Sequence, residues 1–240
     1  MKVLVLRPQP SAGRTARALA NLGHEAVIAP LIEIVPSALS PQARIEADAP
    51  YGAVIAASAN AFALLPQGAR DCLSGLPAYL VGERTAEAAR EAGLRPVAPV
   101  FGTARELAAA LPGSAPGKRL LYLAGHDRRP EIETALRDAG RDVTLVETYE
   151  ARIVEALPLQ AEAALRRSDL GAVLHFSRRT AKAYLLLASE AGLLREALSP
   201  LQVCLSATVA EPLRAAGVAT LALATEPNEA HLLACLPVDG

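Results

Sequence analysis

The stretch RTARALANLGHEAVIAP, residues 14–30, contains the local pattern that decides the fold class. Alanine and leucine recur at helical spacing up to Leu22, and Gly23 follows at the position where helices commonly end in a left-handed residue. After a polar pair, residues 26–29 form a short apolar run that is typical of a buried strand. The stretch therefore predicts a helix followed directly by a strand, the repeating unit of α/β proteins.

The same alternation continues along the chain. Short apolar runs rich in valine, isoleucine and leucine occupy residues 2–6, 26–29, 53–57, 78–81, 119–123, 143–147, 171–175, 202–205 and 218–223. Helical patterns separate most of these runs. They predict an α/β fold with mainly parallel sheets, whose strands are buried on both faces.

The chain also repeats itself. Residues 1–34 resemble residues 118–153, with Gly23 opposite Gly140. The segment GAVIAASANAF (52–62) resembles GAVLHFSRRTA (171–181), and VGERTAEAAREAGL (81–94) resembles LSATVAEPLRAAGV (205–218), with Gly93 opposite Gly217. The repeat predicts two similar α/β units.

Two extended stretches with prolines near their ends, residues 30–44 and 146–160, are equivalent in this repeat. If they lie side by side, the chain leaves the first domain once and returns to it once. The predicted domains are then residues 1–34 plus 154–240 and residues 38–148, with residues 35–37 and 149–153 as linker strands. A single cut near LPGSAPGK, residues 111–118, is the simpler alternative, and the pattern leaves both open.

Composition excludes several classes of function. Lysine and arginine total 24 against 25 acidic residues, so the net charge of −1 provides no field for nucleic acid or an anionic membrane. Cys72, Cys204 and Cys235 are odd in number and lie in apolar sequence, which fits a reduced, cytoplasmic protein. The histidines show no metal-ligand spacing, and polar residues interrupt the apolar stretches that are long enough to raise the question of a membrane span.

Small and hydroxyl-bearing residues recur where predicted strands run into helices: Ser58 with Asn60, Gly82 with Thr85, Ser177 with Thr180, and Ser206 with Thr208. Helix capping explains any one of them. Four such junctions at the carboxyl ends of strands also mark the edge where open α/β sheets bind ligands, and free N–H groups there suit an anion. Nucleotide fingerprints are missing, because no G-x-G-x-x-G follows a strand and residues 113–119 are one residue short of a P-loop.

Basic residues fall at or near the same junctions: Arg7, Arg14, Arg84, Arg128, Arg129, Arg178, Arg179 and Lys182. A solvated surface explains most of them. Arg14, Arg84 and Arg178 lie near predicted helix N-termini, where the helix dipole disfavours a cation, so an anionic ligand would remove a conflict. Tyr149, in the predicted return linker, either packs as strand tyrosines usually do or shares a proton with a leaving hydroxyl.

The chain resembles the uroporphyrinogen-III synthase family over nearly its whole length. The resemblance rests on the order and spacing of VLVLRP (3–8), GHEAVIAPLIEI (23–34), ASANAF (57–62), LVGERTAEAAREAGL (80–94), VETYEA (146–151), HFSRRTAKAYL (175–185) and CLSATVAEPLRAAGV (204–218). It implies two similar α/β domains of flavodoxin-like strand order, joined by a two-stranded linker. It also implies a cyclising lyase of tetrapyrrole and heme biosynthesis, which converts hydroxymethylbilane to uroporphyrinogen III with inversion of the terminal pyrrole ring and loss of water.

The resemblance also implies site residues, because the positions of family site residues fall on Tyr149, Thr85, Ser177 and Ser58. Tyr149 is the catalytic candidate. Together with the junction and basic residues described above, the substrate-binding candidates are Arg7, Arg14, Ser58, Asn60, Gly82, Thr85, Ser177, Arg178, Ser206 and Thr208. No cofactor or metal is implied. The implied partners are the linear tetrapyrrole substrate and, transiently, the deaminase that acts before this enzyme. We expect a cytoplasmic monomer without nucleic acid or membrane contacts.

Two other hypotheses stay open at this point. Ser206, Ala207 and Val209 depart from the family pattern, which would fit a non-catalytic two-domain module that binds an anionic small molecule. A nucleotide-dependent transferase is the third hypothesis, and the missing phosphate motifs weaken it.

Overall fold

The computed structural model describes residues 1–37, 41–48, 50–114, 119–128 and 130–237. These residues form two compact units: Met1–Glu33 together with the chain from Arg152 onward, and Ile34–Ala151. Arg129 and half of the alternative domain cut at residues 111–118, namely residues 115–118, lie outside the described residues. Each unit contains one sheet with helices around it.

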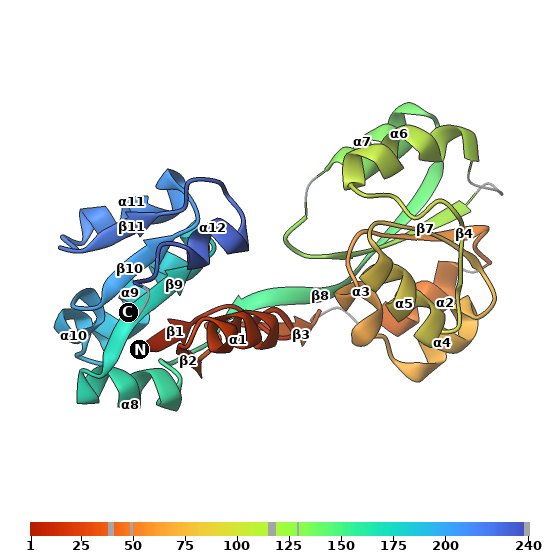
Figure 1. Ribbon diagram of the computed structural model, residues 1–240. Helices are drawn as coiled ribbons and strands as arrows, with labels where there is room; N and C mark the ends of the chain where they lie inside the picture. Colours follow the sequence, from red (N-terminus) through yellow and green to blue (C-terminus); the bar gives the residue numbers. More distant parts are fainter. Residues whose placement is uncertain (38–40, 49, 115–118, 129, 238–240) are drawn as a thin grey trace. The chain divides into compact units, whose positions relative to one another are not determined.

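The first unit contains the five strands of sheet A (Figure 1). They are β1 (Lys2–Val5), β2 (Glu25–Ile28), β9 (Leu170–His175), β10 (Leu201–Cys204) and β11 (Leu221–Leu223). The helices of this unit are α1 (Ser11–Asn21), α8 (Leu159–Arg167), α9 (Arg178–Glu190), α10 (Leu194–Leu198), α11 (Ala207–Ala215) and α12 (Glu229–Leu233). Neighbouring strands of sheet A are all parallel, as the alternation of strands and helices predicts.

Both faces of sheet A are buried. Leu4 and Val173 point into a core formed with α8, α9 and α10, whereas Val3, Val5 and Leu174 pack with α1 and α12 on the other face. Successive side chains of a strand alternate between faces, so a strand covered on both sides needs an unbroken apolar run. This requirement explains why β1 reads KVLV and shows no polar alternation.

The second unit contains sheet B (Figure 1). Its strands are β3 (Ile32–Pro36), β4 (Ala53–Ala56), β5 (Pro77–Leu80), β6 (Arg95–Pro96), β7 (Arg119–Gly125) and β8 (Asp142–Ile153). Its helices are α2 (Pro41–Asp48), α3 (Asn60–Ala63), α4 (Gln67–Leu73), α5 (Glu83–Glu91), α6 (Ala104–Ser114) and α7 (Glu131–Asp138). Helices α6 and α7 cover one face of the sheet, and α2 to α5 cover the other.

Sheet B is mixed. The pairs between β4, β5, β6, β7 and β8 are parallel. The sixth strand, β3, lies beside β8. Ser37 N–H donates to the Thr148 carbonyl, and Val154 N–H donates to the Leu31 carbonyl, so the two segments run in opposite directions. Both strands cross the boundary between the compact units.

The predicted flavodoxin-like strand order holds for sheet A and is wrong for sheet B. Sheet A has the order β11-β10-β9-β1-β2, which is 2-1-3-4-5 when its strands are numbered along the chain. The parallel strands of sheet B have the order β8-β7-β4-β5-β6, which is 5-4-1-2-3 in the same numbering. The sequence repeat matches β7, β8, β4 and β5 with β1, β2, β9 and β10, respectively. When the strands are matched in this way, they lie in the same spatial order in both sheets. Packing determines which strands are neighbours, but the chain enters the second unit at a different strand.

The repeated glycines end equivalent helices. Gly23, Gly93, Gly140 and Gly217 each follow a helix by two residues and have positive φ, between 66° and 85°. Glycine adopts this left-handed conformation without the penalty that a Cβ atom brings. The sequence prediction that a helix ends at Gly23 is confirmed, and the other three glycines of the repeat end helices in the same way.

A buried polar network lies at the end of β9. The His175 side chain is fully buried, and its Nε2 lies 2.8 Å from Oε1 of Gln202. The Gln202 amide nitrogen donates to the carbonyls of Ala197 and Pro200, so its oxygen faces the imidazole and His175 Nε2 carries the proton. His175 Nδ1 is buried without a partner among the described residues. Burial lowers the pKa of His175 from 6.5 to about 4, so this histidine is neutral at physiological pH.

Candidate active site

The carboxyl ends of the parallel strands in sheet B bring Ser58, Gly82, Gly125 and Tyr149 to one edge. Ser58 follows β4, Gly82 follows β5, Gly125 ends β7, and Tyr149 lies in β8 opposite that end. Since parallel strands point the same way, their carboxyl ends meet at a single edge, where open α/β sheets place ligands.

A register shift directs Tyr149 to this edge. Ala124 pairs with Glu147, but the next residue, Gly125, pairs with Tyr149, so Thr148 is passed over. Bulges of this kind redirect side chains. Accordingly, Tyr149 packs against the same core cluster as Val146, three residues earlier, although strict alternation would place the two side chains on opposite faces.

Gly125 makes room for the Tyr149 ring. A Cβ atom added at Gly125 would lie 2.6 Å from the ring carbon that bears the hydroxyl and 2.9 Å from the hydroxyl oxygen. Both distances are shorter than any normal contact, so only glycine allows the phenol to lie across the end of β7. The backbone supports this arrangement, because His126 N–H donates to the Tyr149 carbonyl at 2.9 Å.

Tyr149 lines a cavity of about 190 Å³ within the second unit. Its polar walls come from Ser58, Tyr122, Asp127, Arg128 and Tyr149, and its apolar walls from Ala57, Ala104, Leu123, Ala124, Gly125 and Ile132. Among the described residues, neither the Tyr149 hydroxyl nor the Tyr122 hydroxyl has a hydrogen-bond partner. The cavity therefore contains phenol groups whose bonding capacity is unused.

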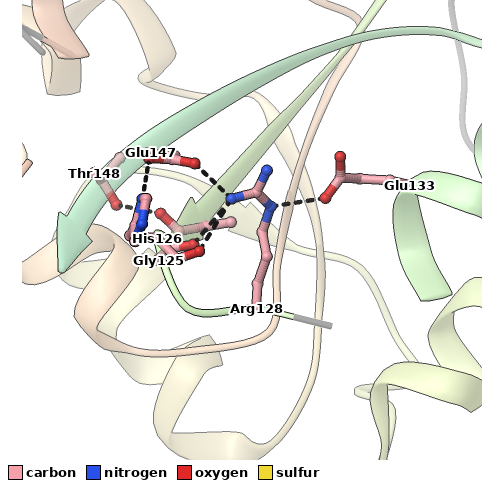
Figure 2. A network of polar contacts seen from close by, with 7 residues as sticks. Gly125, His126, Arg128, Glu133, Glu147 and Thr148 are labelled. Carbon is pink, nitrogen blue, oxygen red and sulfur yellow. Dashed lines mark hydrogen bonds and ion pairs between the residues drawn. The ribbon is translucent and has the colours of Figure 1, made fainter. Parts of the chain in front are cut away.

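Arg128, at the rim of this cavity, is bound to two carboxylates (Figure 2). Its Nε donates to Glu133 at 2.7 Å, and its Nη1 donates to Glu147 at 2.6 Å. Nη1 also lies 3.3 Å from the His126 carbonyl. Glu147 reaches His126 Nδ1 with its other oxygen at 3.0 Å. Arg128 is thus compensated by protein carboxylates and is a weak candidate for binding a carboxylate of a ligand.

The contact between His126 and Glu147 shifts the pKa of both side chains. The hydrogen bond from His126 lowers the pKa of Glu147, with Arg128 adding to the effect and partial burial opposing it. The same hydrogen bond raises the pKa of His126, whose side chain is 64% exposed. Two acidic side chains surround one arginine, and Asp127 adds a third near the rim. This part of the edge therefore carries more acidic than basic side chains.

The other predicted residues of the second unit surround the strand ends. Ser58 Oγ accepts a hydrogen bond from Asn60 N–H at 3.3 Å, so it stabilises a turn, and Ala59 occupies the cap position of α3. Gly82 is the N-cap of α5, with φ of 80°, and its N–H donates to the Phe101 carbonyl at 2.8 Å. Thr85 lies inside the first turn of α5 and is only 4% exposed, so the expectation that Thr85 caps this helix is wrong.

Arg7 occupies the corresponding edge of the first unit. Its guanidinium lies 4.0 Å above the ring of Phe176, and its Nη1 contacts Thr15 and Glu229 at 3.3 Å each. Thr15 also donates to Glu229. Burial lowers the pKa of Arg7, although Glu229 opposes this effect. Among the described residues, Nε and Nη2 of Arg7 have no partner, so part of a rigidly held guanidinium is available for a ligand.

The two other predicted arginines have partners within the protein. Arg178, the first residue of α9, forms an ion pair with Glu211 on α11 at 3.0 Å, so no ligand is needed to explain a cation at this helix N-terminus. Arg14, which is exposed on α1, donates to Ser11 Oγ at 2.9 Å. It lines a larger, mostly apolar groove of about 540 Å³ between α1 and α12, which contains none of the strand-end residues.

The hydroxyl groups at the strand ends of the first unit differ in whether they cap a helix. Ser177 caps α9 by accepting from Thr180 N–H at 3.1 Å. Ser206 occupies the N-cap position of α11 without a side-chain hydrogen bond, and Thr208 is exposed in the first turn of that helix. The capping explanation is confirmed for Ser177, whereas the Ser206 hydroxyl is not used for capping.

Sequence reasoning missed several residues of the cavity. Tyr122, Gly125 and Asp127 received no role, and Arg128 was grouped with surface residues. A signal existed in YLAGHDR (122–128), where a glycine and three polar residues end a buried strand. The register that places this segment against VETYEA was not readable from either segment alone.

Among the described residues, no group of three or more histidine, cysteine, aspartate or glutamate side chains could hold a metal ion. No helix in the described ranges is both long and apolar enough to span a membrane.

The mainly parallel sheets define an α/β protein, and its cavity lies at a strand-end edge, where proteins of this class bind small molecules. A family model described as uroporphyrinogen-III synthase HemD matches residues 13–234. The chain therefore belongs to the uroporphyrinogen-III synthase family.

Solved structures show the same fold. The structure of uroporphyrinogen-III synthetase from Helicobacter pylori 26695 is 20% identical, with a TM-score of 0.57 over 98% of this chain and 97% of that one. A mutant uroporphyrinogen III synthase from the extremely thermophilic bacterium Thermus thermophilus is also 20% identical, with a TM-score of 0.51 over 94% of both chains. A comparison with curated proteins gives no significant match.

Proposed function

We propose that the protein cyclises hydroxymethylbilane to uroporphyrinogen III, inverting the terminal pyrrole ring and releasing water as a cyclising lyase. Family membership over residues 13–234 supports the reaction. The observation that carries the proposal in this chain is the Tyr149 phenol, which lines a cavity at the strand-end edge and has no partner among the described residues. A free phenol in a partly enclosed site is suited to assist a leaving hydroxyl.

In the proposed reaction, Tyr149 donates its proton to the terminal hydroxyl of the substrate as the carbon–oxygen bond breaks. Water departs, and the carbon that bore it becomes part of an azafulvene cation. The terminal pyrrole attacks this carbon to give the spiro intermediate, which rearranges and closes the macrocycle. The ring proton lost on closure returns to the phenolate, so the net change is loss of one water.

The charges around the cavity support the cationic step. Arg128 is compensated by Glu133 and Glu147, so its charge does not oppose a cation nearby. Asp127 adds a further acidic side chain to the cavity lining. The cavity therefore suits the end of the substrate that loses hydroxide, and the substrate carboxylates belong elsewhere.

The first unit offers better partners for those carboxylates. Arg7 keeps two nitrogens available and is held in place by Phe176 and Glu229, so little side-chain entropy is lost when a carboxylate binds. Ser206 and Thr208 add hydroxyls near the start of α11. In this proposal Arg14 and Arg178 contribute less, because each already contacts a side chain of the protein.

The proposal also covers organisation. The two compact units act as two domains, and β3 and β8 serve as the strands that link them. We expect the enzyme to act as a monomer without a cofactor and to receive its unstable substrate from the preceding deaminase.

Separation of porphyrin isomers tests the proposed function. The protein is incubated with enzymatically generated hydroxymethylbilane, the products are oxidised, and isomers I and III are separated by chromatography. Isomer III is expected. Formation of isomer I alone, which arises by spontaneous closure, would refute the assignment even if the substrate bound tightly, and would favour a binding module.

A tyrosine variant tests the catalytic role. Tyr149→Phe should lower kcat at least about 10-fold, because it removes the proton donor but keeps the ring. Tyr79→Phe is the matched control, since Tyr79 lies in the same sheet and does not line the cavity. An unchanged rate in Tyr149→Phe would remove Tyr149 from the mechanism.

A further inference from the structure

A second tyrosine shares the cavity with Tyr149. Tyr122 is the fourth residue of β7 and lies beside Ile55 of β4 in the parallel ladder. Its ring packs in the core cluster formed with α6 and α7, and the residue is only 3% exposed. Its side chain lines the same cavity as Tyr149, Ser58 and Arg128.

The Tyr122 hydroxyl has no hydrogen-bond partner among the described residues, yet it does not belong to the fully buried, unpartnered polar atoms of this part of the chain. The small surface that Tyr122 exposes therefore includes its hydroxyl oxygen, and the residue lines the cavity. By contrast, the Tyr184 hydroxyl, in the core of the first unit, donates to the Ala197 carbonyl at 3.0 Å.

A largely buried tyrosine normally places its hydroxyl against a hydrogen-bond partner. The Tyr122 hydroxyl keeps a small exposed surface and bonds to none of the described residues, so its donor is available to a group that enters the cavity.

The surroundings keep Tyr122 in its donating form. Burial raises its pKa to about 12, and the nearby carboxylate of Glu133 adds to the increase. A neutral phenol donates one hydrogen bond. Tyr149 lies near enough to raise the same pKa slightly, and both tyrosines line the cavity.

We propose that Tyr122 is a second catalytic residue, whose hydroxyl donates a hydrogen bond to the oxygen that Tyr149 protonates as that oxygen leaves the substrate. This inference rests on the proposed function. The leaving oxygen has two lone pairs, so it can take the proton of Tyr149 on one and the hydrogen bond of Tyr122 on the other. Negative charge grows on this oxygen as the carbon–oxygen bond breaks, so the Tyr122 hydrogen bond is strongest in the transition state.

The test compares Tyr122→Phe, Tyr149→Phe, the double variant and Tyr79→Phe. Tyr79 is the matched control, because both Tyr79 and Tyr122 flank Ile55 in the ladder and pack in the same cluster, but Tyr79 does not line the cavity. We measure kcat, KM and the ratio of isomer III to isomer I with enzymatically generated hydroxymethylbilane, and the urea midpoint of each variant.

Tyr122→Phe should lower kcat about 10-fold with little change in KM, and should reduce the share of isomer III. The double variant should be only slightly slower than Tyr149→Phe, because both phenols act on one oxygen. The urea midpoint should stay at or above the wild-type value, since no protein hydrogen bond is lost, whereas Tyr184→Phe should lower it.

Three results would overturn the inference: an unchanged kcat in Tyr122→Phe, a loss of equal size in Tyr79→Phe, or a lowered urea midpoint in Tyr122→Phe, which would indicate a structural hydroxyl. The first of these results overturns the inference even if KM changes, because an effect on KM alone indicates uniform binding. The proposed function is tested separately, because that conclusion depends only on whether the wild-type protein forms isomer III.

Discussion

Lowering the pH from about 7 to about 5 should destabilise the first unit through one buried imidazole, that of His175. The side chain is fully buried, donates through Nε2 to Gln202, and leaves Nδ1 without a partner among the described residues. A proton added to Nδ1 would create a buried charge with no acceptor for its new N–H group. This explains why the pKa of His175 falls from 6.5 to about 4 in the folded protein.

The size of the effect follows from the two pKa values. The unfolded chain binds the proton near pH 6.5 and the folded chain only near pH 4, so the unfolded state holds more protons between these values. The stability contribution is present above pH 6.5 and is lost as the pH falls to 4. The whole gap is worth about 3 kcal/mol, and about 2 kcal/mol of it is lost by pH 5.

The assay compares wild type with His175→Gln, which keeps a polar group but cannot titrate. Hydrogen exchange of β9 peptides in urea, corrected for the intrinsic exchange rate, gives the opening free energy at about pH 7, 6 and 5. Over this pH range the opening free energy of the wild type should fall by about 2 kcal/mol more than that of the variant. Taking the difference between the two proteins cancels the titration of the groups that they share. His231→Gln, which removes an exposed imidazole in the same unit, should behave as the wild type does. Equal pH dependence in wild type and His175→Gln would refute the reasoning.

Two further perturbations test the geometry of the cavity. Gly125→Ala should reduce activity at least as much as Tyr149→Phe and cost about 1–3 kcal/mol of stability, because the new methyl group would overlap the Tyr149 ring. Gly171→Ala, whose new methyl group would have the flexible Met1 side chain as its nearest neighbour, should keep full activity. An active Gly125→Ala enzyme would contradict the proposed position of the phenol. Glu147→Gln should bring the pKa of His126 down towards its ordinary value in an NMR titration, since the hydrogen bond to Glu147 is the largest cause of its increase. An unchanged His126 titration would show that this contact is absent in solution.

Most elements of the fold were predictable from local sequence. All nine predicted apolar runs coincide with strands, because a strand buried on both faces requires an uninterrupted apolar run. The glycines at 23, 93, 140 and 217 end their helices, because a left-handed residue is needed there whatever the surroundings. The two-residue strand β6 was missed, since Arg95 and Pro96 show no apolar pattern, and the helix cap of α5 was misplaced from Gly82 to Thr85.

The positions of the candidate site residues were predictable from the sequence, but their hydrogen-bond and ion-pair partners were not. The strand ends could be located, so Ser58, Gly82, Ser177 and Ser206 were named correctly as junction residues. Which of them donates, accepts or stays unpaired depends on neighbours far away in the chain, such as Phe101 for Gly82 and Glu211 for Arg178. No local pattern contains that information.

The sequence by itself determined the α/β class, the internal repeat, the places where strands run into helices and the resemblance to a family, because each depends on short-range patterns of burial and backbone conformation. Tertiary structure alone decided where the chain enters the second sheet, and how the shift between Ala124 and Gly125 lays the Tyr149 ring against a glycine. It also decided that Arg128 binds two carboxylates, and that Tyr122 shares a cavity with Tyr149. These features arise from register and packing between strands far apart in the chain, and the energies that select them exist only once the sheet has formed.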